Sequence, residues 1–394
     1  MTRLAVGFDA RPALFGRTGF GRAARELMRA LQRRDDLDVR GFGVAWRRAA
    51  PDLEPLPGVV TRRLPARLVS AVARFGVGAE SWLGELDVYQ HTDLVFAPVR
   101  AAPEVLLLHD VLFLREPKWF APGFVRGVMQ RLRPRLAAAT AVVVPSQRTA
   151  DDLLHHELVP APRLHVVPLG CDHVDPTPRP DDRQRVSRLF QRGGRPPLLP
   201  DQLVVLVPGT REPRKNQHAL LEQFLRQRDP HDDARSHDDA GRVPWRFRML
   251  LVGPRGWGCP ALEAALDDAW ASERVTAAGA VAEEDLHAAL RVADVVAFPS
   301  FAEGFGLPVA EALRCGRPVL TSLDTPMADF GGDAVLAVDP RDEEALWYGL
   351  KSLLNEPERR AELAAAGPTA VAPLTWDAMA EACAAIYHSV AGAR

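Results

Sequence analysis

The most informative part of the sequence is Phe298-Pro299-Ser300-Phe301-Ala302-Glu303-Gly304-Phe305-Gly306-Leu307-Pro308-Val309-Ala310-Glu311-Ala312. The apolar run 295–298 that leads into it predicts a buried strand. Proline is favoured in the first turn of a helix, so Pro308 predicts a helix that begins nearby. Gly304 and Gly306 in the intervening loop allow the backbone to approach a ligand closely. A strand, a glycine-containing loop and a helix in this order are typical of α/β proteins with parallel sheets.

The start of this helix is suited to binding an anion. Its free backbone amides and the helix dipole favour a diphosphate group. Glu303 precedes the glycines and Glu311 is expected in the first helical turn, so both should lie at the carboxyl end of the sheet, where such folds bind ligands. Carboxylates beside phosphates are electrostatically unfavourable, so we expect the two glutamates to bind the neutral hydroxyls of a sugar and a ribose. The alternative is a capping glutamate and a surface glutamate without function.

A second turn carries basic residues, within Gly209-Thr210-Arg211-Glu212-Pro213-Arg214-Lys215-Asn216. It follows the apolar run 203–207 and precedes a predicted helix. Arginine and lysine at such a turn can hold a diphosphate and stabilise the charge that it gains as a leaving group. The alternative is a solvated basic turn.

The rest of the chain repeats the alternation of strands and helices. Continuous apolar runs separated by helical patterns predict parallel sheets that are covered on both faces. The predicted strands are 105–108, 141–144, 164–167, 203–207, 249–252 and 295–298, and the predicted helices include 21–31, 149–156, 219–226 and 375–390. Ser146 is expected to cap the helix that begins near Thr149.

Length and composition favour two domains of α/β class. The chain has 394 residues, 47% of them hydrophobic, and domains commonly contain about 100–200 residues. We predict an N-terminal Rossmann-like domain (1–175), a linker rich in Pro, Arg, Asp and Gly (176–200), a C-terminal Rossmann-like domain (201–374) and a final helix (375–394) that packs back on the N-terminal domain.

Charge and cysteine content exclude several classes of protein. The formal net charge of -2 argues against a nucleic-acid-binding protein. The four cysteines, Cys171, Cys259, Cys315 and Cys383, are far apart and form no CxxC pair, which argues against a zinc site or a disulfide framework. We expect a cytoplasmic protein, because no signal peptide or membrane-spanning run is evident.

Two polar features leave alternatives open. The N-terminal part carries arginines among apolar residues, namely Arg62, Arg63, Arg67, Arg74, Arg126, Arg131, Arg133 and Arg135. These arginines indicate either a solvated helix face or peripheral contact with the inner face of a membrane. Two His-Asp-Asp triplets in 226–241 contain metal-ligand residue types. A solvated surface insertion is the favoured interpretation of that stretch, and we expect no bound metal and no cofactor.

Together the motifs resemble the family 4 retaining glycosyltransferases, which have the GT-B fold of two Rossmann-like domains facing across a cleft. The family's Glu-x7-Glu signature is matched by Glu303 and Glu311. The stretch 209–216 is similar to a subgroup rich in mannosyltransferases. Further matches are Gly19-Phe20-Gly21-Arg22, His109-Asp110, 144–146, 167–172, 251–257 and 315–319. One departure is 329–334, where the family often has a Glu before Gly-Asp-Ala, which leaves the contacts of this loop open.

The resemblance implies that the N-terminal domain (1–175) binds the acceptor and that the C-terminal domain (201–374) binds the nucleotide sugar, and it implies roles for individual residues. Lys215 and Arg214, with Arg211 as a third candidate beside Gly209, would bind the donor diphosphate. Glu303 would hold hydroxyls of the donor sugar and Glu311 the ribose. His109 would reach the donor sugar from the N-terminal domain. The remaining donor-binding candidates are Gly19, Gly21, Gly304, Phe305, Gly306 and Leu307. Beyond the resemblance, His91 is a further candidate for bordering the acceptor.

The implied reaction is retaining, metal-independent transfer of a hexosyl group from a nucleoside diphosphate sugar to a hydroxyl of a glycan or lipid-linked acceptor. GDP-mannose is the favoured donor, with a UDP-sugar as the alternative. A Rossmann-type oxidoreductase is disfavoured, because Gly16-x-x-Gly19-x-Gly21 is not the dinucleotide-binding spacing. A non-catalytic nucleotide-sugar-binding subunit would be expected to lose the site residues that this chain retains.

Overall fold

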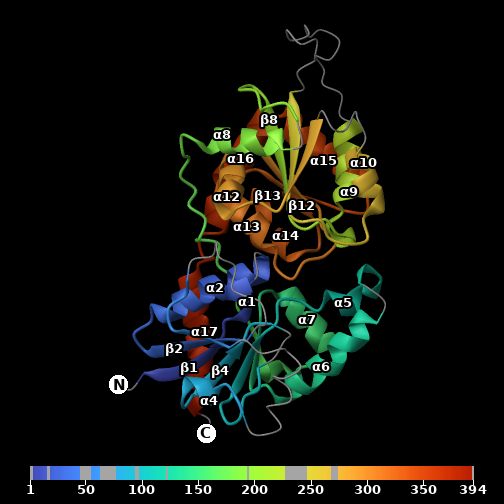
Figure 1. Ribbon diagram of the computed structural model, residues 1–394. Coiled ribbons are helices and arrows are strands. Elements are labelled where there is room, and N and C mark those ends of the chain that lie inside the picture. The colour runs from blue at the N-terminus through green and yellow to red at the C-terminus, as the bar shows by residue number, and fades with distance from the viewer. Residues whose placement is uncertain are drawn as a thin grey trace, which may run out of the picture. The chain divides into compact units, whose positions relative to one another are not determined.

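The structure is a computed structural model of the 394-residue chain. It describes residues 3–15, 18–44, 55–62, 77–93, 97–120, 123–192, 195–226, 246–267 and 274–392. The chain divides into two compact units (Figure 1). Unit 1 contains Met1–His173 and Leu374–Arg394, and unit 2 contains Val174–Pro373.

Unit 1 is built on a parallel sheet. Among the described residues it has seven strands in the order β3-β2-β1-β4-β5-β6-β7. They are β1 (Leu4–Asp9), β2 (Leu37–Val44), β3 (Val59–Arg62), β4 (Val88–His91), β5 (Glu104–Leu107), β6 (Ala141–Val144) and β7 (Leu164–Val166). The strand order reverses between β1 and β4, and the carboxyl edge at such a reversal is where doubly wound folds bind ligands.

Helices lie on both faces of this sheet (Figure 1). They are α1 (Arg11–Phe15), α2 (Gly19–Gln32), α4 (Glu80–Leu83), α5 (Leu112–Arg115), α6 (Phe124–Ala138), α7 (Gln147–His155) and α17 (Trp376–Gly392), with short 3-10 helices η1 (Pro117–Trp119) and η2 (Ala161–Arg163). Helices α5, α6 and α7 contribute buried side chains to one cluster with β5 and β6. Helix α17 packs on α2.

Unit 2 contains a second parallel sheet. Its described strands follow the order β10-β9-β8-β11-β12-β13. They are β8 (Leu203–Pro208), β9 (Phe247–Val252), β10 (Val275–Gly279), β11 (Val295–Phe298), β12 (Val319–Ser322) and β13 (Val335–Val338). The pair β8 and β11 lies at the centre, where the strand order reverses.

Helices also cover both faces of the second sheet, with α9, α10 and α15 on one side and α8, α12, α13 and α16 on the other (Figure 1). They are α8 (Asp182–Gln191), α9 (Gln217–Arg226), α10 (Pro260–Asp267), α12 (Glu283–Val292), α13 (Leu307–Arg314), α14 (Pro326–Gly331), α15 (Glu343–Asn355) and α16 (Pro357–Ala370), with η3 (Pro213–Lys215) and η4 (Gly332–Ala334). Apolar residues of α9, α10 and α15 form one core with the strands.

The elements predicted from periodicity are confirmed, with small shifts at their ends. Strands β6 and β11 have the predicted bounds, and helix α13 begins at Leu307. Ser146 caps α7, because its side chain accepts from the Thr149 amide at 3.3 Å. Glu311 lies in the second turn of α13 instead of the first, since the helix already begins at Leu307.

The stretch expected to be a linker, 176–200, contains helix α8. Val186, Leu189 and Phe190 of this helix are buried, and α8 packs on α12. Arg291 of α12 donates to both carboxylate oxygens of Asp182 at 2.7 Å, and both side chains are almost fully buried. This segment is therefore part of unit 2, which begins at Val174.

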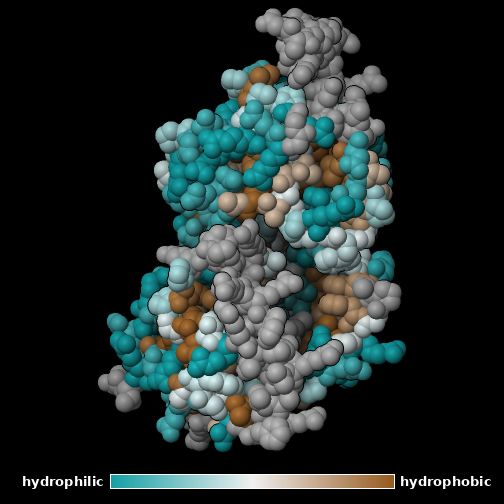
Figure 2. All heavy atoms as spheres, viewed as in Figure 1, coloured by the Kyte–Doolittle hydropathy of each residue, from teal (hydrophilic) through white to brown (hydrophobic). Residues whose placement is uncertain are grey.

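The surface seen in Figure 2 is mainly hydrophilic, with separate hydrophobic areas on both units. Most large apolar side chains of the described residues lie inside the two units. Within the part of the chain that the structure describes, no helix combines the length and apolar character needed to cross a membrane.

Candidate active site

The two turns singled out in the sequence meet in unit 2 because β8 and β11 are neighbouring strands. Lys215 Nζ lies 2.5 Å from Glu303 Oε1, and an Arg214 guanidinium nitrogen lies 2.8 Å from the same oxygen. The side chains of Lys215 and Glu303 are 10% and 9% exposed. The turns are also joined by the main chain, since the Phe301 amide donates to the Arg214 carbonyl at 2.8 Å. We call Glu212, Arg214, Lys215 and Glu303 the charged cluster.

Burial and opposite charges set the protonation of this cluster. Burial alone would raise the pKa of Glu303, but the charges of Arg214 and Lys215 outweigh it and lower that pKa to about 2. Burial lowers the pKa of Lys215, and the Glu303 carboxylate opposes the change. Arg214 also pairs with Glu212 at 2.7 Å. Two cations and two carboxylates therefore share one largely buried site.

The helix that follows Glu303 starts in a conformation that only glycine tolerates well. Gly306 precedes α13 with φ +95°. A Cβ at this position would lie 2.1 Å from Met327 Cγ, so a larger residue would clash as well as strain the backbone. Gly304, Phe305 and Leu307 complete the loop, and Glu311 of α13 is 2% exposed. The start of α13 thus follows directly on the loop that carries Glu303 of the charged cluster.

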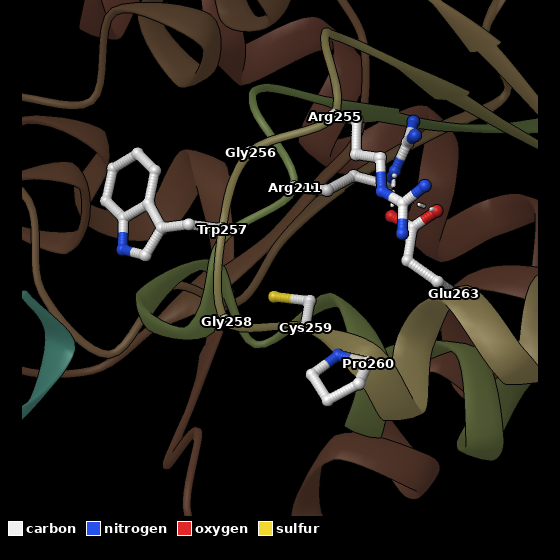
Figure 3. A pocket seen from close by; sticks show the side chains of 8 residues that line it. All are labelled: Arg211, Arg255, Gly256, Trp257, Gly258, Cys259, Pro260 and Glu263. Carbon is white, nitrogen blue, oxygen red and sulfur yellow. Dashed lines mark hydrogen bonds and ion pairs between the residues drawn. The ribbon is translucent and has the colours of Figure 1, made fainter. Parts of the chain in front are cut away.

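Gly209 and Arg211 lie in the basic turn 209–216, but the Arg211 side chain is directed toward Glu263 of α10. Its Nε donates to Glu263 Oε1 of α10 at 2.7 Å, and Arg255 approaches Glu263 Oε2 at 3.6 Å. Figure 3 shows both arginines converging on Glu263 beside a cavity of about 210 Å³, with Trp257 pointing away from them. The structure therefore separates Arg211 from the Lys215–Glu303 pair.

In unit 1, His109 follows β5 and packs against the start of α2. Its ring stacks on Phe20 with centroids 4.5 Å apart. Burial lowers the pKa of His109 to about 4, so the imidazole is neutral at physiological pH. Gly19 and Gly21 lie in the first turn of α2, which Thr18 caps by accepting from the Gly21 amide at 3.4 Å. His109, Phe20 and the two glycines are thus brought together within unit 1.

His91 has a structural environment. It is fully buried in β4, and its Nε2 lies 2.7 Å from Glu104 Oε2. Arg135 of α6 donates to the same carboxylate oxygen at 3.0 Å. This chain of contacts ties β4 and β5 to α6, which accounts for a histidine at this position.

Three contacts of the site were missed in the sequence. Glu212 balances Arg214, the Phe298 ring lies 4.5 Å from Lys215 Nζ, and Phe305 packs on Phe330 with centroids 5.2 Å apart. The two motifs contained all of these residues except Phe330, but only the fold shows which side chains meet. Phe330 lies in α14, and the stretch 329–334 that departs from the family pattern forms the end of α14 and η4 instead of a loop.

Metal-ligand residue types do not gather elsewhere in the described chain. Within those residues, no group of three or more His, Cys, Asp or Glu side chains could hold a metal ion. The two His-Asp-Asp triplets lie outside the described residues, as do Arg63, Arg67, Arg74 and Gly16.

The arrangement in unit 2 can bind a ligand that has both phosphates and hydroxyls. Lysine and arginine side chains form strong charge-assisted bonds to phosphate oxygens, and the start of α13 adds backbone amides and a favourable dipole. A carboxylate held ionised beside them can accept hydrogen bonds from hydroxyls. This combination of groups matches a nucleoside diphosphate sugar.

Family models match both parts of the chain. Residues 17–174 match "Glycosyltransferase Family 4", and residues 195–370 match "Glycosyl transferases group 1". The chain is 26% identical over 389 residues to an O-antigen chain mannosyltransferase B of Escherichia coli, covering 95% of this chain and 97% of that protein. It is 31% identical over 258 residues to a D-inositol 3-phosphate glycosyltransferase of Xylanimonas cellulosilytica, covering 64% of this chain and 57% of that protein.

Solved structures share the fold at low sequence identity. A sucrose-phosphate synthase from Thermosynechococcus elongatus superposes with a TM-score of 0.76 at 20% identity, covering the whole of both chains. The lipopolysaccharide glycosyltransferase WaaG gives a TM-score of 0.70 at 16% identity, covering 98% of this chain and 99% of that one. Two parallel-sheet units, the paired turns of unit 2 and these matches lead to one conclusion: the chain is a family 4-like glycosyltransferase of the GT-B fold.

Proposed function

We propose that the chain transfers a hexosyl group, with mannosyl favoured, from a nucleoside diphosphate sugar to a hydroxyl of a glycan or lipid-linked acceptor, with retention and without a metal ion. The observation that carries this proposal is the contact of Lys215 and Arg214 with Glu303 beside the start of α13. The mannosyltransferase that is 26% identical over nearly its full length favours mannose. A structural neighbour that contains UDP-glucose keeps UDP-sugars as the alternative donors.

The charged cluster suggests how the leaving group is stabilised. Departure of the glycosyl group adds negative charge to the diphosphate, and preorganised cations stabilise such charge most strongly in a site with little water. Lys215 and Arg214 are held in place before the donor arrives, because Glu303 and Glu212 fix their positions. We propose that the diphosphate takes over part of this pairing, so that Glu303 can bind hydroxyls of the sugar.

Two cationic side chains and a helix start can replace a divalent ion as the partner of the phosphates. We therefore propose that no metal or cofactor takes part. In a front-face reaction the acceptor hydroxyl would bond to the anomeric carbon on the face from which the diphosphate departs, and the departing phosphate would accept the hydroxyl proton. Attack on that face would keep the anomeric configuration without an enzymatic nucleophile. We also propose Glu311 as the ribose ligand, and His109 as a residue that binds a sugar substrate.

Peripheral contact with the inner face of the membrane is part of the same proposal. The described part of α6 has four arginines and no acidic residue, and Arg126, Arg131 and Arg133 are exposed. Such a helix is attracted to anionic lipids. Arg135 is committed to Glu104, so it is not counted among the lipid contacts.

The experiment that tests this function is a panel of GDP-, UDP- and ADP-sugars assayed for thermal shift, donor hydrolysis and transfer to lipid-linked acceptors. We expect one donor to be hydrolysed slowly and transferred faster. The matched variants are Lys215→Ala, which should abolish turnover, and Lys351→Ala on the exposed side of α15, which should not. If no nucleotide sugar stabilises the protein or is turned over, the proposal is wrong.

A further inference from the structure

The carboxyl edge of the unit 1 sheet carries His109 together with polar groups to which the proposed function gives no role. Strand β4 lies between β1 and β5. Asp9 therefore ends β1 beside Thr92, which follows β4, and His109 follows β5 on the other side. Thr92 lies between the other two: its hydroxyl donates to the Asp9 carbonyl at 2.7 Å, and its backbone influences the pKa of both the Asp9 carboxyl and the His109 ring.

Asp9 is buried, with 3% of its surface exposed. Its Oδ1 accepts from the Arg11 amide at 3.1 Å, but its Oδ2 is buried and has no hydrogen-bond partner among the described residues. Arg11 itself forms an ion pair with Asp93. Burial raises the pKa of Asp9 to about 6, and the Arg11 charge opposes this rise. A buried carboxyl oxygen without a partner is costly and is rare in folded proteins.

His109 has a similar unpaired atom. Burial keeps the ring neutral, and the nearby Thr92 backbone only partly opposes the fall in its pKa. Nε2 of His109 is buried and has no hydrogen-bond partner within the described chain. In a neutral imidazole with its proton on Nδ1, this nitrogen is a hydrogen-bond acceptor. The Phe20 ring that stacks on His109 is 50% exposed, so an apolar surface lies next to this acceptor.

We propose that Asp9 and His109 form a hydroxyl-binding pair, in which Asp9 Oδ2 and His109 Nε2 accept hydrogen bonds from a sugar substrate. Sugars fit this site because they offer several hydroxyl donors together with C–H groups that can pack on Phe20. The inference rests on the proposed glycosyl transfer and adds Asp9, for which the sequence motifs provided no role. Asp9 and His109 would then bind either the glycosyl group of the donor or the acceptor.

A purely structural role for Asp9 predicts a different result. Its Oδ1 stabilises the start of α1 through the Arg11 amide, and asparagine or serine performs such capping nearly as well as aspartate. Asp9→Asn and Asp9→Ser should therefore preserve the fold but replace or remove Oδ2. Asp87→Asn is the matched control, because Asp87 Oδ2 accepts from the Ala5 amide at 2.8 Å at the opposite edge of the same sheet.

The experiment measures initial rates with donor and acceptor varied separately, donor hydrolysis without acceptor, and binding of the nucleoside diphosphate. We expect Asp9→Asn, Asp9→Ser and His109→Gln to lower kcat/KM by roughly tenfold to a hundredfold, as for loss of a hydrogen bond to a buried acceptor. Nucleoside diphosphate affinity should stay unchanged. If donor hydrolysis falls in parallel, the hydroxyl belongs to the donor, and if only transfer falls, it belongs to the acceptor.

Wild-type kinetics in Asp9→Asn, or an equal loss in Asp87→Asn, would overturn the inference. These results differ from a failure of the proposed function, in which the wild-type chain would turn over no nucleotide sugar. Thermal unfolding of each variant shows whether a loss of activity reflects loss of the fold.

Discussion

Replacing Glu303 by glutamine should destabilise unit 2 and abolish transfer without weakening the binding of a free nucleoside diphosphate. Glutamine keeps the size of the side chain and removes its charge. Lys215 and Arg214 then lose the carboxylate oxygen that both contact, at 2.5 and 2.8 Å. The phosphate-binding cations remain, and they no longer have Glu303 as a competing anion.

The size of the effect follows from the pKa of Glu303. This pKa falls from 4.5 to about 2 on folding, and each unit corresponds to about 1.4 kcal/mol, so the ionised carboxylate contributes about 3 kcal/mol. An exposed ion pair would contribute at most about 1 kcal/mol. Because folding lowers the pKa, the contribution is complete above pH 4.5 and is lost as the pH falls toward 2.

Urea unfolding of wild type and Glu303→Gln between pH 3 and pH 7, together with calorimetry of nucleoside diphosphate binding at pH 7, measures these effects. The stability difference should be largest at pH 7 and should shrink toward pH 3. A difference that stays below about 1 kcal/mol at pH 7, or diphosphate affinity that drops as strongly as in Lys215→Ala, would refute the reasoning.

Further predictions concern the neighbouring residues. Lys215→Ala should weaken binding of the nucleoside diphosphate roughly tenfold to a hundredfold, since a charge-assisted contact is lost; unchanged affinity in calorimetry would count against the diphosphate role. Glu311→Ala should weaken binding of the free nucleoside diphosphate, whereas Glu303→Ala should leave that binding unchanged and reduce transfer; an equal loss of nucleoside diphosphate affinity in both variants would contradict the division of roles. Activity should survive EDTA, and complete loss that a divalent ion restores would show metal dependence. Gly306→Ala should lower the melting temperature and the donor affinity together, because the new Cβ meets Met327 at 2.1 Å; a variant with wild-type melting and affinity would show that the loop can rearrange.

Local patterns in the sequence were sufficient to predict the α/β class, the central strands and the loop before α13. They depend on neighbouring residues, such as the apolar run 295–298 and the proline after Leu307. The sequence could not show that Lys215 and Glu303 are in contact, because that requires β8 and β11 to be adjacent although about 90 residues separate them.

Arg211 also shows what the sequence alone could not predict. As an arginine it is as suitable a phosphate ligand as Arg214, and both residues lie in the same turn. Only the fold shows that Glu263 approaches Arg211 while Glu303 approaches Arg214. Asp9 was likewise not assigned a role, since its environment is created by strands that lie about 80 and 100 residues away in the sequence.

The return of α17 to unit 1 has a consequence for how the protein is made. The Cys171 amide donates to the Leu374 carbonyl, and the Trp376 amide donates to the Asp172 carboxylate. The buried Tyr387 hydroxyl donates to Gln90, in the middle of the first sheet, at 2.8 Å. During translation, unit 1 begins to emerge from the ribosome first but obtains this helix last. Unit 2 is synthesised in between as a continuous segment. A ribosome that stalls before Leu374 therefore leaves a chain in which unit 2 is complete and unit 1 still exposes the surface that α17 covers.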